Sequence, residues 1–320
     1  MKKLLLTGGA GFIGSHIAYA LINRFEKIYL IDNMRTGDVR NLSEHFEFIQ
    51  EDCAKIDYSK YKELADVDSI IHFAGQSSAE ISFRDPLYDF NSNLLSTIKL
   101  LEFATNNSIR SFIFASSVTV YKPGQNMPLL EKSTVDNSNS FYAISKLTSE
   151  KYISLYSSSF PSIHTTSLRL FNVYGPAQNL ANPDQGMLSI YLAQAFESDK
   201  ILVKGSLDRI RDFVHVYDVV DVVDRCLKCN HPSGMALNVC SGKPTEVLSL
   251  IKTISKSLEK ELIINNSSST PGDTFEHWGS NNLCESTLNK SNWVSLEDGL
   301  KMTIEAHNKS RWFDERLSYN

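Results

Sequence analysis

Tyr142 and Lys146 have the residue types and the spacing of a proton-transfer pair. Side chains four residues apart share one face of a helix, and residues 147–155, directly after the pair, have helical spacing. A neighbouring ammonium group stabilises a phenolate, so Lys146 should lower the pKa of Tyr142 from ~10 towards the range of a general base. The spacing on its own also fits an incidental surface pair. The catalytic interpretation gains weight from Ser116 and Ser117, which end an apolar run.

A glycine-rich turn near the start of the chain could bind a pyrophosphate group. Three leucines at 4–6 predict a parallel strand buried on both faces, and residues 15–22 predict a helix. Between them lie glycines at positions 8, 9, 11 and 14. Such a turn lets the backbone approach phosphates, and the first N–H groups of the helix point at the anion. The turn alone is weak evidence.

The next predicted strand, residues 27–31, ends in Asp32 and Asn33. An acidic residue roughly 20 residues after the glycines can bond both ribose hydroxyls of an adenosine, and it would repel a 2′-phosphate. This favours NAD over NADP, although the nearby Arg35 could accept that phosphate. Asp52 follows a third predicted strand, at residues 46–50. It could bond an adenine amino group or be a solvated loop carboxylate.

The elements that must position these residues alternate between strands and helices. Further strands are predicted at residues 69–75 and 110–115, and one long helix at residues 86–106. This order predicts a doubly wound parallel sheet, whose ligands bind beyond the carboxyl ends of the strands. Each polar motif falls at such an end. His72, inside a strand, is interpreted as a packed residue and not as a catalyst.

Length and composition limit the class of protein. The 320 residues allow one large or two modest domains, and the formal net charge of −5 argues against nucleic-acid binding. No apolar run is long enough to cross a membrane, and no signal peptide is expected. The five scattered cysteines suit a reducing compartment, so we expect a cytoplasmic protein. Cys226 and Cys229 form a lone CxxC without a second pair, and no metal site is predicted.

Together these motifs resemble the extended short-chain dehydrogenase/reductases, in particular the NAD-dependent nucleotide-sugar epimerases and dehydratases. The resemblance spans nearly the whole chain. It is carried by TGGAGFIG (7–14), Asp32-Asn33, HFAG (72–75), Asn93, SSVTVY (116–121), YAISK (142–146), RLFNVYGP (169–176), RDFVHVYDVV (211–220), PGD (271–273) and WVSLEDGLKMT (293–303).

The resemblance implies an α/β fold, a Rossmann-like doubly wound parallel sheet with a smaller mixed α/β substrate-binding domain. The NAD-binding domain would comprise residues 1–172 and about 212–245. The nucleotide-sugar-binding domain would comprise about 173–211 and 246–320. Family members usually dimerise through two helices, so a homodimer through residues 86–106 and 140–157 is expected.

The resemblance also implies roles for individual residues. Tyr142 would remove the proton from a sugar hydroxyl, Lys146 would lower its pKa and bond the nicotinamide ribose, and Ser117 would hydrogen-bond the same hydroxyl. NAD would contact Gly8, Gly11, Phe12, Ile13, Gly14, Asp32, Asn33, Asp52, Cys53, Phe73, Ala74, Gly75, Asn93, Ser116, Tyr142 and Lys146. The nucleotide sugar would contact Ser77, Ser117, Tyr142, Asn172, Val203, Arg211, Asp273 and His277. For Arg211 and Asp273 the alternative is an interdomain salt bridge.

Differences within the family narrow the reaction. The dehydratases carry an acid–base pair where this chain has Val118 and Thr119, neither of which can protonate a leaving hydroxyl. Decarboxylases tend to carry glutamate at the Thr119 position, and double epimerase/reductases need a cysteine, which is not found near Ser117. The prediction is NAD-dependent 4-epimerisation of a nucleotide-diphosphate hexose, UDP-glucose/UDP-galactose or the N-acetyl forms. The alternatives are a nucleotide-4-keto-sugar reductase and, from another class, a non-catalytic NAD-binding protein.

Three departures from the family pattern leave the sugar and the nucleotide open. Thr270 replaces a second phosphate-binding arginine. His277 stands at the position that limits the room for an N-acetyl group, and Gly279-Ser280 replaces Ala-Asp.

Overall fold

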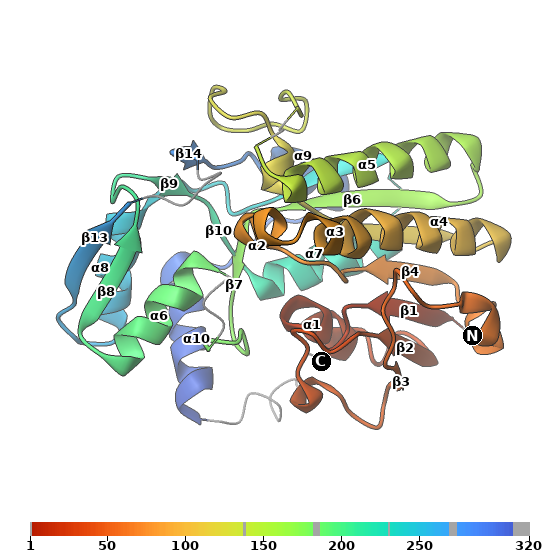
Figure 1. Cartoon of the computed structure of the whole chain (residues 1–320), viewed down its shortest axis with the longest axis horizontal. Coiled ribbons are helices and arrows are strands. Elements are labelled where there is room, and N and C mark those ends of the chain that lie inside the picture. Colours follow the sequence, from red (N-terminus) through yellow and green to blue (C-terminus); the bar gives the residue numbers. More distant parts are fainter. Residues whose placement is uncertain (1, 137–138, 182–185, 230, 269–273, 310–320) are drawn as a thin grey trace.

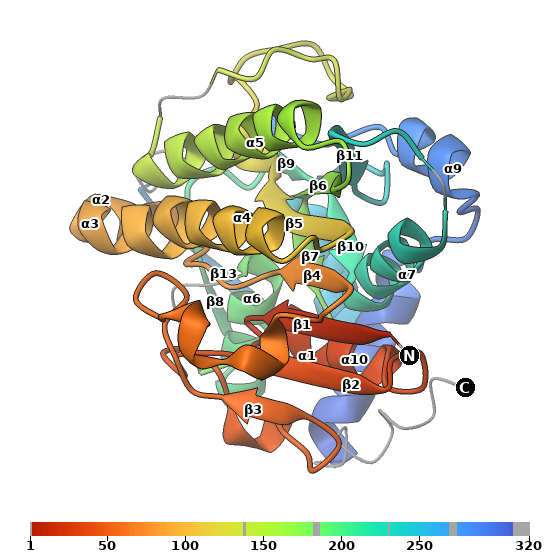
Figure 2. The same ribbon diagram turned by 90° about the vertical axis from the view of Figure 1, so that its right-hand side faces the viewer.

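Seven parallel strands form one continuous sheet in the computed structural model, which describes residues 2–136, 139–181, 186–229, 231–268 and 274–309. They lie in the order β11-β6-β5-β4-β1-β2-β3, with every neighbouring pair parallel (Figures 1 and 2). Their bounds are β1 Lys3–Thr7, β2 Lys27–Ile31, β3 Glu47–Ile49, β4 Ser69–His72, β5 Ser111–Ser117, β6 His164–Leu170 and β11 Met235–Val239. The predicted Rossmann-like doubly wound sheet is confirmed.

Helices cover both faces of this sheet, as the apolar runs in its strands require (Figure 2). On β1, Leu4 and Leu6 belong to the apolar cluster formed with α1 (Phe12–Ala20) and α7 (Val216–Lys228). Leu5 belongs to the cluster on the other face, with α4 (Ser96–Asn106) and α5 (Phe141–Ser159). All three leucines are fully buried. Burial on both faces explains why β1 is a continuous apolar run and does not alternate.

The stretch predicted as one long helix, residues 86–106, is interrupted. After α2 (Ala79–Arg84) come α3 (Pro86–Asp89), a π-helical turn (Phe90–Leu95) and then α4. Hydrogen bonds in a π turn reach one residue further, which rotates the side chains that follow. The carbonyl oxygen of Asn93 accepts hydrogen bonds from the hydroxyls of Thr97 and Ser149. These side-chain bonds satisfy the backbone where the turn widens, and the spacing of apolar residues does not reveal them.

A second group of elements lies beyond the carboxyl ends of the sheet (Figure 1). Helices α6 (Met187–Glu197), α8 (Val247–Ser257) and α10 (Leu296–Lys309) pack around a core that includes Leu192, Val203 and Ile251. Three small sheets pair β7 (Asn172–Tyr174) with β10 (Phe213–His215), β9 (Ile210–Arg211) with β12 (Thr245–Glu246) and β14 (Glu276–His277), and β8 (Lys200–Lys204) with β13 (Ile263–Ser267).

Part of the second half of the chain returns to the large sheet. Helix α7 packs against α1, β11 pairs with β6, and α9 (Asn282–Leu288) packs beside β11. The predicted domain boundaries themselves stay a prediction. Among the described residues, no helix combines the length and the apolarity that crossing a membrane requires.

Candidate active site

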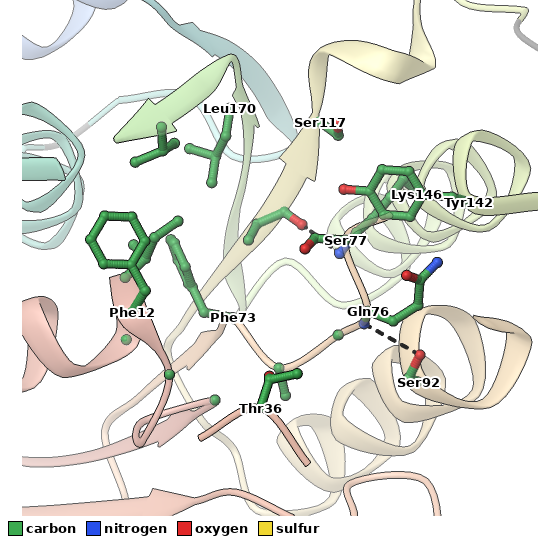
Figure 3. Close-up of a pocket in the computed structure, with 18 of the residues that line it drawn as sticks. Phe12, Thr36, Phe73, Gln76, Ser77, Ser92, Ser117, Tyr142, Lys146 and Leu170 are labelled. Carbon is green, nitrogen blue, oxygen red and sulfur yellow. Dashed lines mark hydrogen bonds between the residues drawn. The ribbon is translucent and has the colours of Figure 1, made fainter. Parts of the chain in front are cut away.

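A cavity of about 390 Å³ opens beyond the carboxyl ends of β1, β4, β5 and β6 (Figure 3). Small-molecule sites have volumes of ~300–1,000 Å³. Most of the predicted site residues line this cavity: Gly8, Gly11, Phe12, Ile13, Gly14, Asp32, Asn33, Asp52, Cys53, Phe73, Ala74, Gly75, Ser77, Ser116, Ser117, Tyr142, Lys146, Asn172 and His277.

The turn between β1 and α1 presents bare backbone to the cavity. Gly8 has a φ of +73°, and a Cβ there would lie 2.7 Å from the backbone nitrogen of Ala74. A Cβ on Gly14 would overlap the carbonyl oxygen of Gly8. Gly11, the N-cap of α1, has no side chain to bond the first N–H groups of the helix. These features are those of an anion cradle.

The carboxylate of Asp32 lines the same cavity and is held by the backbone. Its Oδ2 accepts the N–H of Ala10 at 3.1 Å, and its Oδ1 accepts the N–H of Met34 at 2.9 Å. Burial raises the pKa of Asp32, and these hydrogen bonds oppose the rise. Arg35 lines the same cavity, and its guanidinium lies 3.7 Å from the centre of the Tyr88 ring in a cation–π contact.

Helix α5 brings the tyrosine and the lysine to the cavity. It begins at Phe141 because the side chain of Ser140 caps it, accepting the N–H of Ala143. Tyr142 and Lys146 therefore lie close to the start of this helix, where it faces the end of β5. Figure 3 shows both side chains on the same wall of the cavity.

Ser117, at the end of β5, completes the group. Its Oγ accepts the backbone N–H of Thr119 at 3.2 Å and the Thr119 hydroxyl at 3.0 Å, and the Ser117 side chain lies near enough to Tyr142 to lower the pKa of that phenol. Lys146 donates from Nζ to the carbonyl oxygen of Ala115 at 2.9 Å. The structure thus brings together the three residues that the sequence suggested for proton transfer.

The predicted lowering of the Tyr142 pKa is not found. Burial raises the pKa of Tyr142 to about 12, the nearby Ser117 side chain opposes the rise, and the negative charge of Asp89 adds to it. Burial also lowers the pKa of Lys146 to about 8. The Lys146 Nζ lies 5.9 Å from the centre of the Tyr142 ring, and its hydrogen bond goes to the main chain. Desolvation therefore dominates at Tyr142, which keeps its proton at neutral pH in the protein without cofactor or substrate.

A buried ion pair fixes α5 against the sheet. Arg169 on β6 donates to both carboxylate oxygens of Glu150, from Nε at 3.0 Å and from Nη2 at 2.7 Å. Glu150 also accepts the hydroxyl of Ser116. The Nη1 of Arg169 donates to the Tyr121 hydroxyl and to the carbonyl oxygen of Glu131, both at 3.0 Å. This network joins α5, β5, β6 and the segment after β5.

His72 is a packed strand residue, as predicted. Its ring is fully buried, with Nδ1 at 2.7 Å from the hydroxyl of Thr7 and Nε2 at 3.1 Å from the hydroxyl of Thr97. Burial, and to a smaller extent the charge of Lys146, lowers the pKa of His72 to about 3. The imidazole is therefore neutral at physiological pH and links β1 and β4 to α4.

Replacing His72 by glutamine should make the protein less sensitive to acid. The pKa of His72 is about 3 when folded and ~6.5 when unfolded, so the unfolded chain binds the extra proton between these values. The contribution of His72 to the free energy of unfolding is therefore complete above the unfolded pKa and decreases as the pH falls through this window. At about pH 4 the decrease amounts to about 3 kcal/mol. Urea unfolding at about pH 7 and about pH 4 should show a smaller loss in the variant. An equal loss would contradict the structural role.

Two predicted contact residues lie away from the cavity wall. Val203 is fully buried in the core of the second group, because side chains alternate along β8 and its neighbours Leu202 and Lys204 are exposed. Arg211 is also buried, and its guanidinium donates to the carbonyl oxygens of Thr274 at 2.6 Å and Phe275 at 3.1 Å. Arg211 therefore anchors the segment before β14, and both its predicted phosphate contact and the alternative salt bridge with Asp273 stay predictions.

Two more predicted residues need separate mention. Asn93 is fully buried and stands behind the cavity wall, where its Oδ1 lies 2.5 Å from the place a Cβ of Gly75 would take. Asp273 lies outside the described residues, so its predicted contact with a uridine ribose stays a prediction.

The structure adds cavity residues that sequence reasoning did not assign. Thr119 entered the sequence analysis only as a residue without a carboxyl group, which argued against other reactions of the family. In the structure its hydroxyl donates to Ser117 and positions the Ser117 hydroxyl. Gln76, Tyr88, Gln178 and Met187 also line the cavity. Gln76 directly follows the HFAG motif and Gln178 closely follows RLFNVYGP, so proximity to these motifs is the available signal.

The cysteines and acidic residues do not form a metal site in the described parts of the chain, where no group of three or more possible His, Cys, Asp or Glu ligands occurs. All five cysteines are free, and Cys229 stands at the C-cap of α7 and not within the helix.

The chain is similar to known proteins over nearly its whole length. Residues 4–240 match the NAD-dependent epimerase/dehydratase family. A UDP-glucose 4-epimerase of Yersinia enterocolitica is 29% identical over 312 residues, covering 89% of this chain and 91% of that protein. The structure of UDP-N-acetylglucosamine 4-epimerase from Methanobrevibacter ruminantium M1, in complex with UDP-N-acetylmuramic acid, has a TM-score of 0.89 and 29% identity and covers 97% of this chain and 99% of that chain. The UDP-glucose 4-epimerase of Thermus thermophilus, in complex with NAD, has a TM-score of 0.85 and 26% identity and covers 96% of this chain and 99% of that chain.

Proposed function

The chain belongs to the NAD-dependent epimerase/dehydratase family, and we propose that it catalyses the 4-epimerisation of a nucleotide-diphosphate hexose, with UDP-hexoses as the first candidates. The observation that carries this proposal is the meeting of Tyr142, Ser117 and Lys146 at the wall of the cavity that also contains the glycine turn. The similar proteins named above are UDP-sugar 4-epimerases by description, which supports the class of substrate.

The residues at the cavity fit NAD. A Cβ on Gly8 or Gly14 would meet the protein's own backbone, so these glycines allow the tight turn and the close packing that bring the start of α1, where a diphosphate can bind, to the cavity. The backbone N–H groups of Ala10, Gly11 and Met34 bond the two oxygens of Asp32, which together offer about four acceptor positions, so the carboxylate can still accept from a ribose hydroxyl. When bound, NAD⁺ supplies a hydride acceptor and a positive charge.

The chain's own residues hold and move the proton. Once Tyr142 has ionised, its phenolate oxygen accepts the proton of the sugar 4-hydroxyl and later returns it. Ser117, which two hydrogen bonds from Thr119 orient, bonds the same hydroxyl. Lys146, held by the carbonyl oxygen of Ala115, stabilises the phenolate. The hydroxyl chemistry is therefore assigned to the end of β5 and the start of α5.

Further residues bear on the type of reaction and on the sugar. Val118 and Thr119 put no carboxyl group beside Ser117, which supports epimerisation over elimination of water. We assign Ser77, Asn172 and His277 to the substrate side of the cavity, which they line. Burial and then the charge of Arg211 keep the pKa of His277 well below its usual range, so the His277 ring is neutral.

A panel of UDP-hexoses, with and without N-acetyl groups, tests the proposed reaction. The purified protein is incubated with each sugar without added NADH, and products are separated by chromatography while NADH absorbance is followed. A 4-epimer formed without net NADH is the expected result. Failure with every UDP sugar, together with stoichiometric NADH consumption on a 4-keto sugar, would replace the epimerase by a nucleotide-4-keto-sugar reductase.

We also propose that two chains associate through the surface of α2, α3 and α5. These helices lie side by side in both views (Figures 1 and 2), and on them the exposed large apolar side chains are Phe83, Leu87, Phe90, Phe141, Ile144, Tyr152 and Leu155, with Phe90 on the π turn. A cluster of this kind marks an interaction surface. These side chains lie outside the buried core, so they can be altered without opening a cavity in it.

The double replacement Leu87→Asp and Leu155→Asp should convert a dimer into a monomer. The two side chains are 75% and 63% exposed, so a charge there costs little in the monomer and is unfavourable in an apolar interface. Light scattering after gel filtration measures the mass. Val39→Asp, at a similarly exposed valine elsewhere, should stay dimeric. A monomeric wild-type chain would sink this proposal.

The free cysteines agree with a reducing compartment, and we propose a cytoplasmic location.

A further inference from the structure

A buried carboxyl group near Lys146 has no role in the mechanism above. Asp89, the last residue of α3, is fully buried. Its Oδ1 accepts hydrogen bonds from Nε2 of Gln76 and, at 2.9 Å, from Nδ2 of Asn93, and its Oδ2 accepts the hydroxyl of Ser145 at 2.6 Å. Three donors around two oxygens are the surroundings of an ionised carboxylate.

The three donors come from three different elements of the site. Gln76 belongs to the segment after β4, Asn93 to the π turn, and Ser145 to α5, directly before Lys146. Figure 3 shows Gln76 and its neighbour Ser77 on the same side of the cavity as Lys146. Asp89 therefore connects the cavity segment around Ser77 with the helix that carries the proton-transfer pair.

Asp89 also settles the orientation of the Asn93 amide. The Nδ2 of Asn93 donates to Asp89 and, at 3.0 Å, to the carbonyl oxygen of Gln76. Because both partners are acceptors, the NH₂ group of the amide, and not its oxygen, must face them. The Oδ1 is buried and has no hydrogen-bond partner within the described residues. It lies 2.5 Å from the place a Cβ of Gly75 would take, and the Lys146 Nζ lies 3.3 Å from the same place. The amide oxygen and the ammonium are thus both close to this one glycine.

The charges around Lys146 leave Asp89 as its counter-charge. Glu150, one turn further along α5, is paired with Arg169. His72 on β4 is neutral, since burial keeps its pKa at about 3. Tyr142 is also neutral, since burial raises its pKa to about 12. No lysine or arginine forms an ion pair with Asp89 in the part of the chain that the structure describes. Burial lowers the pKa of Lys146 to about 8, and Asp89 opposes this more than Glu150 does.

We propose that Asp89 is a positioning residue of this active site: it holds the Asn93 amide with its oxygen towards Lys146, and it supplies the negative charge that keeps Lys146 an ammonium. The effect on turnover rests on the proposed epimerase function. The effect on Lys146 itself does not.

Asp89→Asn isolates the charge from the geometry. An asparagine has the same shape, its oxygen can accept from Gln76 and Asn93, and its NH₂ can donate to the Ser145 hydroxyl. The measurement is a ¹³C NMR titration of protein labelled at lysine Cε, without cofactor or substrate. The signal of Lys146 is the one that disappears in Lys146→Arg. We expect the titration midpoint of Lys146 to fall by about one pH unit in Asp89→Asn, as the loss of one opposite charge nearby predicts.

Ser145→Ala is the matched control, because it removes one hydrogen bond to Asp89 and keeps the charge. It should leave the Lys146 midpoint in place. A shift in Ser145→Ala equal to that in Asp89→Asn, or no shift in Asp89→Asn, would overturn the proposal. If Asp89→Asn does not fold, Asp89→Ser removes the same charge and leaves room for a water, and it is read in the same way.

Turnover gives the second readout. In Asp89→Asn the fall of kcat at high pH should begin about one pH unit lower, with KM unchanged. A uniform loss of kcat at all pH values would indicate a packing defect and would contradict the electrostatic role. If the wild type converts no UDP sugar, the proposed function fails, while the NMR titration still decides the role of Asp89.

Discussion

Replacing Tyr142 by phenylalanine should lower kcat by about 10³-fold, within the ~10²–10⁴-fold range of general acid–base catalysis. The change removes a hydroxyl that lies near Ser117 in the first turn of α5, next to the cavity. It leaves the ring and its packing in place. The glycine turn and Asp32 are untouched, so NAD affinity, measured by calorimetric titration, should stay within a few-fold of the wild type.

Tyr152→Phe is the matched control on the same helix. Tyr152 is 40% exposed, away from the cavity wall, and its loss of a hydroxyl should not change turnover. If Tyr142→Phe kept more than a tenth of the wild-type kcat, the proposed base would be wrong. A non-catalytic NAD-binding protein would show no difference between the two variants.

Removing the carboxylate of Glu150 should have the largest effect on stability. Glu150→Ala leaves the guanidinium of Arg169 in a site where both side chains are less than a tenth exposed, and an uncompensated buried charge costs about 3–5 kcal/mol. Urea unfolding measures the free energy of unfolding. The double variant Glu150→Met with Arg169→Leu removes both charges and should recover much of that loss.

An exposed ion pair provides the comparison. Lys27 and Glu47 pair at 3.0 Å on side chains that are 42% and 57% exposed, so Glu47→Ala should cost less than about 1 kcal/mol. Equal losses for Glu150→Ala and Glu47→Ala would show that the buried network contributes no more than a surface contact. Failure of the double variant to recover stability would point instead to the lost hydrogen bonds of Ser116 and Tyr121.

Much of the large sheet was predictable because its signals are local. The leucines of β1, the glycines of the turn and the start of α1 follow one another within a few residues, and each carries its own conformational preference. The same holds for Tyr142 and Lys146, whose spacing puts them on one helix face. The helix predicted over residues 86–106 was only partly right, because residues 90–95 form a π turn that the spacing of apolar residues does not reveal.

Contacts between distant parts of the chain decided the rest. The alternation in β8 shows that one of Leu202 and Val203 is buried, but only the packing of α6 and α8 selects Val203. The resemblance implied a phosphate contact for Arg211, and only the structure shows that its guanidinium also donates to carbonyl groups more than 60 residues away.

By itself, the sequence determined the doubly wound sheet and the glycine turn, since spacing along the chain encodes both, and the family resemblance added the identity of the proposed proton-transfer residues. Only the tertiary structure decided how those residues are charged. Burial of Tyr142 and Lys146 moves both pKa values in directions that spacing cannot predict. Asp89, which opposes the shift at Lys146, meets Ser145 from 56 residues away. Desolvation and long-range charge depend on what surrounds a side chain in space, and no local pattern records that.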